Sequence, residues 1–191
     1  LMKKVSDIYA IKIIFFITAC YVGLWAIRIP TIKDQLQTDY VGVGYIMLSF
    51  AIGSIIAMIF ANALILKTST KSILTYTLIA EGCLWLPVPF IQELWQFMIF
   101  SFIFGVSYGA FEIACNVYAS NLEIREKKSM MSGFHAFWSL GVLFGSLITS
   151  FLLEWDYSFI FNILLYVIIL LPLSLYFVLC LENQVETKSD N

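Results

Sequence analysis

The chain has 191 residues and a formal net charge of −2; 61% of its residues are hydrophobic and only 13% are charged. A soluble domain of this size could not cover so much apolar surface with polar side chains, so the composition indicates a membrane protein. No basic patch suited to nucleic acid is evident, so we expect no nucleic-acid partner. The four cysteines fall in four different apolar runs without CxxC spacing. We therefore expect no metal site, no disulfide and no cofactor.

Six apolar runs follow one another, at residues 8–30, 41–66, 72–90, 95–120, 130–153 and 158–181. Each has about the 20 residues that a spanning helix needs. The sequence thus predicts an all-α, polytopic membrane protein with six transmembrane helices. The polar tail 182–191 has no periodicity, and we expect it to be disordered.

The basic residues indicate how these helices are oriented. With the N-terminus in the cytoplasm, eight of the eleven fall on the inner side: Lys3, Lys4, Lys67, Lys71, Arg125, Lys127, Lys128 and Lys188. Arg28 and Lys33 fall on the outer side, and Lys12 lies near the inner end of the first helix. Because cytoplasmic loops are enriched in Lys and Arg, we expect both termini inside and a location in the cytoplasmic (inner) membrane.

The fourth predicted helix carries an ionisable residue, Glu112, well away from either end of its apolar run. Steps of three and four residues place it on one face with small or polar neighbours only: Ser101, Gly105, Gly109, Asn116 and Ser120. A carboxylate in hydrocarbon is costly and normally faces a bundle interior or a wet cavity. We therefore expect this face to line a cavity.

Two other ionisable residues come out at a similar depth. At a rise of about 1.5 Å per residue, Glu112, His135 and Glu81 lie roughly 12, 9 and 13 Å from the inner ends of their helices. The fifth helix also has a polar face: Ser132, His135, Ser139 and Ser146. Helices 4 and 5 are therefore expected to face one cavity. Glu81 has no polar residues around it, so we expect it to make a structural hydrogen bond.

The roles of these residues have alternatives. Glu112 is interpreted as a solute acceptor or proton carrier in preference to a neutral residue that only ties helices together. Asn116 is equally suited to a hydrogen bond with a sugar-like solute and to an interhelical hydrogen bond. His135 fits a polar cavity wall better than a proton relay.

The first helix has its own polar face, formed by Thr18, Tyr21, Trp25 and Arg28. This face is suited to an outer cavity wall. Equally, Arg28 could extend to the outer interface, with Trp25 as an ordinary interfacial aromatic residue.

Two glycine pairs, Gly105/Gly109 and Gly141/Gly145, have the GxxxG spacing, and we expect them to pack helices closely. The string GVSYG at 105–109 also matches a serine-hydrolase elbow, but it lies inside a predicted membrane helix. Its Ser107 is roughly 11 Å in depth from His135, too far for a nucleophile and its base, so we do not expect an enzyme.

Three strings resemble the N-terminal half of a major facilitator superfamily transporter, of the fucose-permease type and its uncharacterised bacterial relatives. They are GLWAIRIPTIKDQL at 23–36, GVSYGAFEIACNVYAS at 105–120 and MSGFHAFWSLGVLFG at 131–145. The resemblance implies a central cavity, lined in part by helices 1, 4 and 5, that opens alternately to either side. It also implies that Glu112 and Asn116 bind solute and that His135 is a polar cavity residue.

The chain departs from this family in three places. Trp25–Ala26 stands where the fucose-permease type has a helix-1 carboxylate. The loop between helices 2 and 3 reads NALILKTSTK at 62–71 in place of a pattern resembling G-x-L-x-D-R-x-G-R-K, and keeps only Lys67 and Lys71 as basic residues. The family has two six-helix halves, and the six apolar runs here are expected to form one of them.

The sequence therefore predicts one half of a carrier that moves a small polar solute, such as a sugar, by alternating access. The predicted solute contacts are Glu112, Asn116, His135, Trp25 and Arg28. The predicted partners are the solute, the lipid bilayer, and a second six-helix half or a second copy of the chain. The alternative is a six-helix membrane protein that does not transport, either a solute-capture subunit that needs a partner or an inactive fragment.

Overall fold

The computed structural model describes residues 6–183, so the predicted disordered tail lies outside the described residues except for residues 182 and 183. Within this range the chain is all-α, as predicted, with six long helices and one short 3₁₀ turn. The elements are α1 (Asp7–Gln35), α2 (Tyr40–Lys67), α3 (Thr70–Trp85), η1 (Val88–Phe90), α4 (Leu94–Glu126), α5 (Met131–Glu154) and α6 (Phe159–Cys180). Six segments of the described chain are long and apolar enough to cross a membrane, and each coincides with all or most of one long helix.

Local sequence explains where these helices begin and end. Four of them start at a polar residue whose side chain accepts a backbone hydrogen bond from the first turn: Ser6, Asp39, Ser69 and Ser158. The apolar run 72–90 is divided into α3 and η1, because Pro87 cannot continue the helix with a backbone N–H. The helix α4 extends to Glu126, so most of the expected connector 121–129 is helical, and Lys127 ends it with a left-handed backbone, φ 53°.

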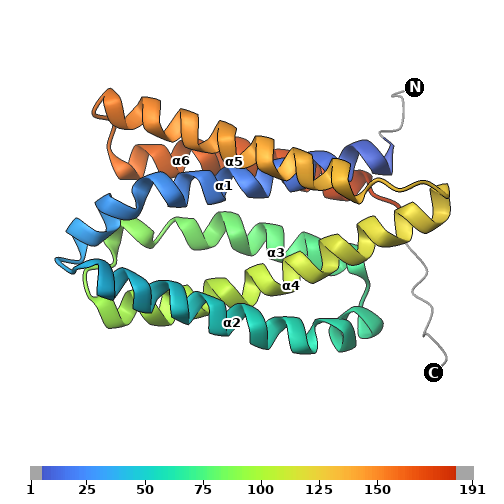
Figure 1. Cartoon of the computed structure of the whole chain (residues 1–191), viewed down its shortest axis with the longest axis horizontal. Coiled ribbons are helices and arrows are strands. Elements are labelled where there is room, and N and C mark those ends of the chain that lie inside the picture. The colour runs from blue at the N-terminus through green and yellow to red at the C-terminus, as the bar shows by residue number, and fades with distance from the viewer. Residues whose placement is uncertain (1–5, 184–191) are drawn as a thin grey trace.

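The helices form two groups that meet along α3 (Figure 1). In one group α1 packs against α5 and α6, and in the other α4 packs against α2 and α3; contacts between α3 and α6 join the groups. Exchanging α1–α3 with α4–α6 maps this contact pattern onto itself. The bundle thus has the form of a three-helix repeat, with the second copy inverted, a common plan among transporters.

Close glycine contacts hold the α2–α4 pair together. A Cβ atom at Gly105 or Gly109 would overlap the carbonyl oxygen of Phe50 or Ser54, respectively. In return, a Cβ at Gly53 of α2 would overlap a backbone carbonyl of α4. The two backbones therefore approach as closely as they do only because these positions lack side chains.

The α1–α5 pair is built in the same way. Gly141 and Gly145 of α5 lie against the carbonyl oxygens of Phe16 and Cys20, and Gly23 of α1 lies against the α5 backbone. The predicted packing role of both GxxxG pairs is thus confirmed.

The beginning of α1 and the end of α6 lie at the same end of the bundle (Figure 1). There the nearly buried carboxylate of Asp7 accepts a hydrogen bond from Arg125 Nη1 at 2.9 Å and one from the Glu182 backbone N–H at 3.2 Å. Arg125 also pairs with the Glu182 carboxylate at 3.3 Å. This cluster ties together three helix ends that are far apart in the sequence.

Candidate functional site

The polar stripe of α4 is divided between two environments. Ser101, Gly105 and Gly109 are buried against α2, and the Ser101 hydroxyl donates to the Ile46 carbonyl at 3.0 Å. The expectation that the whole stripe lines a cavity is therefore wrong for the two glycines, which form a packing seam. A period of three to four residues shows which residues share a face, but not what that face contacts.

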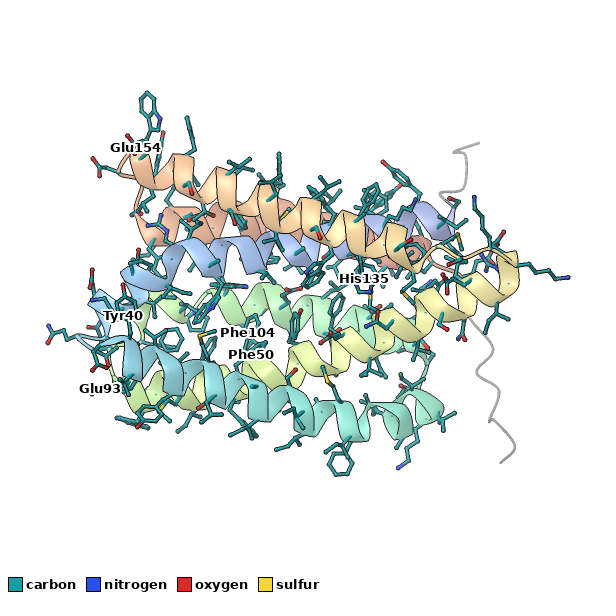
Figure 2. All side chains as sticks on the ribbon, viewed as in Figure 1. Tyr40, Phe50, Glu93, Phe104, His135 and Glu154 are labelled. Carbon is teal, nitrogen blue, oxygen red and sulfur yellow. The ribbon has the colours of Figure 1, made fainter. Side chains whose placement is uncertain are left out.

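Glu112 and His135 lie at the place where α4 and α5 face each other. Glu112 is half-buried, His135 is exposed, and the two side chains are within electrostatic reach of each other. Figure 2 shows His135 directed from α5 toward α4, and its ring is 5.7 Å from the Phe15 ring of α1. The structure therefore brings together two of the predicted solute contacts from helices that share few other contacts.

Asn116 lies one turn beyond Glu112 on α4 and is half-buried. In the part of the chain that the structure describes, its side-chain amide forms no hydrogen bond. The interhelical hydrogen bond considered for Asn116 is therefore absent among the described residues. Both its donor and acceptor atoms are free to bind a solute.

Trp25 lies elsewhere, at a cavity of about 360 Å³ between α1, α2, α3 and α4. Most of the cavity wall is aromatic: Tyr21, Trp25, Phe50, Trp85, Phe97 and Phe104 are among the lining residues. Figure 2 shows Phe50 of α2 and Phe104 of α4 close together, and their ring centroids are 6.1 Å apart. Glu112, Asn116 and His135 do not line this cavity.

Glu81 of α3 is 8% exposed and lines the aromatic cavity. The Thr18 hydroxyl of α1 lies beside its carboxyl group but completes no hydrogen bond to a described residue. Among the described residues, no Lys, Arg or His forms an ion pair with Glu81. The structural hydrogen bond expected of Glu81 therefore has one neighbouring candidate, Thr18, and the carboxyl group is placed at a cavity.

Sequence reasoning considered only the α1 side of this cavity, where Tyr21 and Trp25 lie on the possible outer cavity wall. It missed the other walls because they are aromatic, and aromatic residues in a membrane helix are easily taken as lipid-facing. A signal was present in the sequence. Phe97, Phe100, Phe104 and Tyr108 recur at steps of three and four residues on α4, and all four line the cavity.

Tyr108 lies between the two regions. It lines the aromatic cavity, and its ring is 6.3 Å from the Trp138 ring of α5. Glu81 and Glu112 are both within electrostatic reach of its hydroxyl. The aromatic cavity and the Glu112–His135 region are therefore neighbours that share one side chain.

Arg28 contacts α6 and does not line the aromatic cavity. It is 2% exposed, and its Nε and Nη2 donate to Asn162 Oδ1 at 3.0 Å and to the Tyr157 carbonyl at 3.2 Å. Its guanidinium also lies over the Phe159 ring, 5.4 Å from the centroid. The structure thus places Arg28 in a buried contact between α1 and α6, one turn from Trp25 but directed to a different neighbour.

The chain is similar in sequence to one family of membrane proteins and to two curated proteins. The family model described as Major Facilitator Superfamily matches residues 12–190. An uncharacterised MFS-type transporter of Yersinia pestis is 27% identical over 145 residues, which cover 74% of this chain and 37% of that protein. An uncharacterised transporter of Sinorhizobium fredii is 25% identical over 141 residues, which cover 69% of this chain and 35% of that protein. No solved structure matches the chain.

Proposed function

We propose that this chain, which belongs to the major facilitator superfamily, forms one six-helix half of a carrier that moves a small polar solute by alternating access. Membrane transport is the function of the family and of both relatives by name. The alignments span little more than a third of each relative's length, so the activity of a whole transporter is part of the proposal.

The observation that carries the proposal is that Glu112 of α4 and His135 of α5 lie within electrostatic reach of each other. A carboxylate and an imidazole inside an apolar bundle normally face a polar cavity. Together with the unpaired amide of Asn116, they offer acceptors and donors on one wall. A solute with several hydroxyl groups, such as a sugar, needs a set of this kind.

The exposed polar face of α5 supports a second half or a second copy as partner. His135 and Ser139 are both exposed and lie one turn apart, on a helix that otherwise presents large apolar side chains. The Ser139 hydroxyl donates to the His135 carbonyl at 3.1 Å. The His135 imidazole is therefore the group to which lipid offers no hydrogen bond, whereas a partner that encloses a wet cavity can offer one. The proposed location is the inner membrane, with both termini in the cytoplasm. Eight of the eleven basic residues then lie on the cytoplasmic side.

Trp25 and Arg28 have lesser parts in this proposal. Trp25 contributes an aromatic wall on the outer half of α1. For Arg28, the hydrogen bonds to Asn162 and Tyr157 support an indirect contribution, by holding α1 against α6.

Uptake into proteoliposomes containing the purified chain tests the proposal, with L-fucose, D-galactose and D-glucose as labelled probes. We expect Glu112→Gln and Asn116→Ala to lower uptake by about tenfold or more, because each removes a buried polar contact to the solute. Glu93→Gln, an exposed carboxyl that precedes α4, is the matched control. Unchanged uptake in both variants would end the claim.

A solute-capture subunit that needs a partner is the second candidate, favoured by the exposed His135 of α5, which a partner would cover. It predicts saturable sugar binding that Glu112→Gln abolishes, without uptake by the chain alone. Cross-linking in native membranes separates the two candidates further: a partner or a second copy supports the carrier, and monomers alone contradict it.

A further inference from the structure

We propose that the aromatic cavity between α1, α2, α3 and α4 binds a lipophilic organic cation, with Glu81 as the counter-ion. This inference goes beyond the proposed function, because the polar solute is assigned to Glu112, Asn116 and His135, none of which lines the cavity. Tyr108 lies between the two sites.

The walls provide the first argument. Trp85 lies among other rings, with centroid separations of 6.0 Å to Tyr21, 6.4 Å to Trp25 and 5.8 Å to Phe104. Trp25 in turn lies 6.2 Å from Phe97. The negative faces of such rings attract an ammonium or phosphonium group, and a desolvated site strengthens the attraction. A cage of several rings is the usual form of a quaternary-ammonium site.

Charge provides the second argument. Among the described residues that line the cavity, Glu81 has the one carboxyl group, and none is Lys, Arg or His. A buried carboxylate costs much free energy unless a cation is close to it. Because none of the described lining residues is a cation, a bound organic cation would favour the ionised form of Glu81 and pair with it, and an anion would be repelled.

Polar groups are few in this cavity, which disfavours a sugar with many hydroxyl groups; among the described residues, Trp85 Nε1 is a buried donor without a partner. The Ser101 hydroxyl already donates to the Ile46 carbonyl, and the Tyr21 hydroxyl donates to the Tyr166 carbonyl at 3.5 Å. Each sugar hydroxyl that entered without a partner would lose its hydrogen bonds to water. A cation with apolar substituents needs only the rings and one carboxylate. The volume of the cavity, about 360 Å³, also fits a small ligand, since ligand cavities begin at about 300 Å³.

Isothermal calorimetry on the purified full chain tests the inference with benzyltrimethylammonium as the probe. We expect saturable binding that Glu81→Gln weakens by about tenfold or more, since the variant removes the counter-ion and keeps the shape. Glu93→Gln should bind as the wild type does. Equal affinity in Glu81→Gln and wild type would overturn the inference, and so would the absence of saturable binding to folded wild-type protein.

The walls give a second test that does not depend on whether Glu81→Gln folds. Trp25→Leu and Phe104→Leu should each weaken binding of the same probe severalfold, whereas Trp155→Leu, which is 65% exposed and outside the cavity, should not. Equal effects at all three positions would contradict the proposed place of binding. Neopentylbenzene, in which carbon replaces the charged nitrogen, should not compete with the cation; competition by it would show an apolar site instead. These assays measure only binding of the cation. The cation proposal can therefore fail while the transport proposal holds, and the transport proposal can fail while the cation proposal holds.

Discussion

The guanidinium of Arg28 in α1 donates from Nε to Oδ1 of Asn162 in α6 at 3.0 Å, across 134 positions of sequence. Asn162 is fully buried, and Nη2 of Arg28 also donates to the Tyr157 carbonyl at the start of α6. A charge placed this deeply is tolerated because these acceptors and the Phe159 ring surround it. The contact fixes the ends of α1 and α6 relative to each other.

Arg28→Leu should lower the free energy of unfolding by about 1–3 kcal/mol, because it leaves the Asn162 carbonyl oxygen buried without a donor. Unfolding in detergent with increasing SDS would measure this change. The double variant Arg28→Leu/Asn162→Leu should cost less than the sum of the two single variants, since it removes both buried polar partners. Strictly additive costs would show that the two side chains do not depend on each other.

Gly105→Ala should destabilise the bundle by about 1–3 kcal/mol, because the new methyl group would overlap the Phe50 carbonyl and force α2 and α4 apart. Gly44→Ala is the matched control on α2, since no atom lies within 4 Å of its added Cβ. We expect the control to be neutral or to stabilise by about 0.5–1 kcal/mol, as for any exposed glycine within a helix. Similar destabilisation by both variants would contradict a close seam.

Asp7→Asn should cost about 1.5–3 kcal/mol of unfolding free energy, because Asp7 is 3% exposed and accepts hydrogen bonds from Arg125 and Glu182. Glu126→Gln removes a carboxylate that pairs with the same arginine at 3.1 Å but is exposed. We expect this second change to cost less than about 1 kcal/mol, as exposed ion pairs do. Equal costs would mean that burial does not distinguish the two pairs.

A cysteine at Ser139 should react with a membrane-impermeant maleimide in native membranes, since Ser139 is exposed on the His135 face of α5. Leu140→Cys is the control at the same depth, because Leu140 is 51% exposed on a face a quarter of a turn away. The exposed Cys83 and the half-buried Cys180 would first be replaced by serine. Equal reactivity at the two positions would contradict a wet cavity confined to one face.

Much of the fold follows from the sequence. Continuous apolar runs of spanning length predict the six helices, and small residues four apart predict close helix pairs, because both effects depend on properties local to a helix. Which helix each glycine pair packs against does not follow from the sequence in this way. Nothing in Gly105 itself indicates that Phe50 will lie against it, since α2 and α4 meet only through the tertiary fold.

The site was predicted in part for the same reason. Glu112 and His135 could be matched because an orientation and a fixed rise per residue place them at one depth. Arg28 was expected near a cavity, but its position against Asn162 depends on how α6 packs. For Glu81 most of the surrounding rings come from three other helices, and Trp85 is the described lining ring that α3 itself provides, so the pattern within α3 gave little sign that Glu81 faces a cavity.

The most direct test of the central claim is a double-mutant cycle on solute affinity with Glu112→Gln, His135→Gln and the double variant. Binding to the purified chain would be measured for whichever of L-fucose, D-galactose and D-glucose binds most tightly. If both side chains contact one solute, the losses should be non-additive, with a coupling of about 0.5–3 kcal/mol. Independent, additive losses, or an affinity that neither variant changes, would contradict a solute site shared by Glu112 and His135.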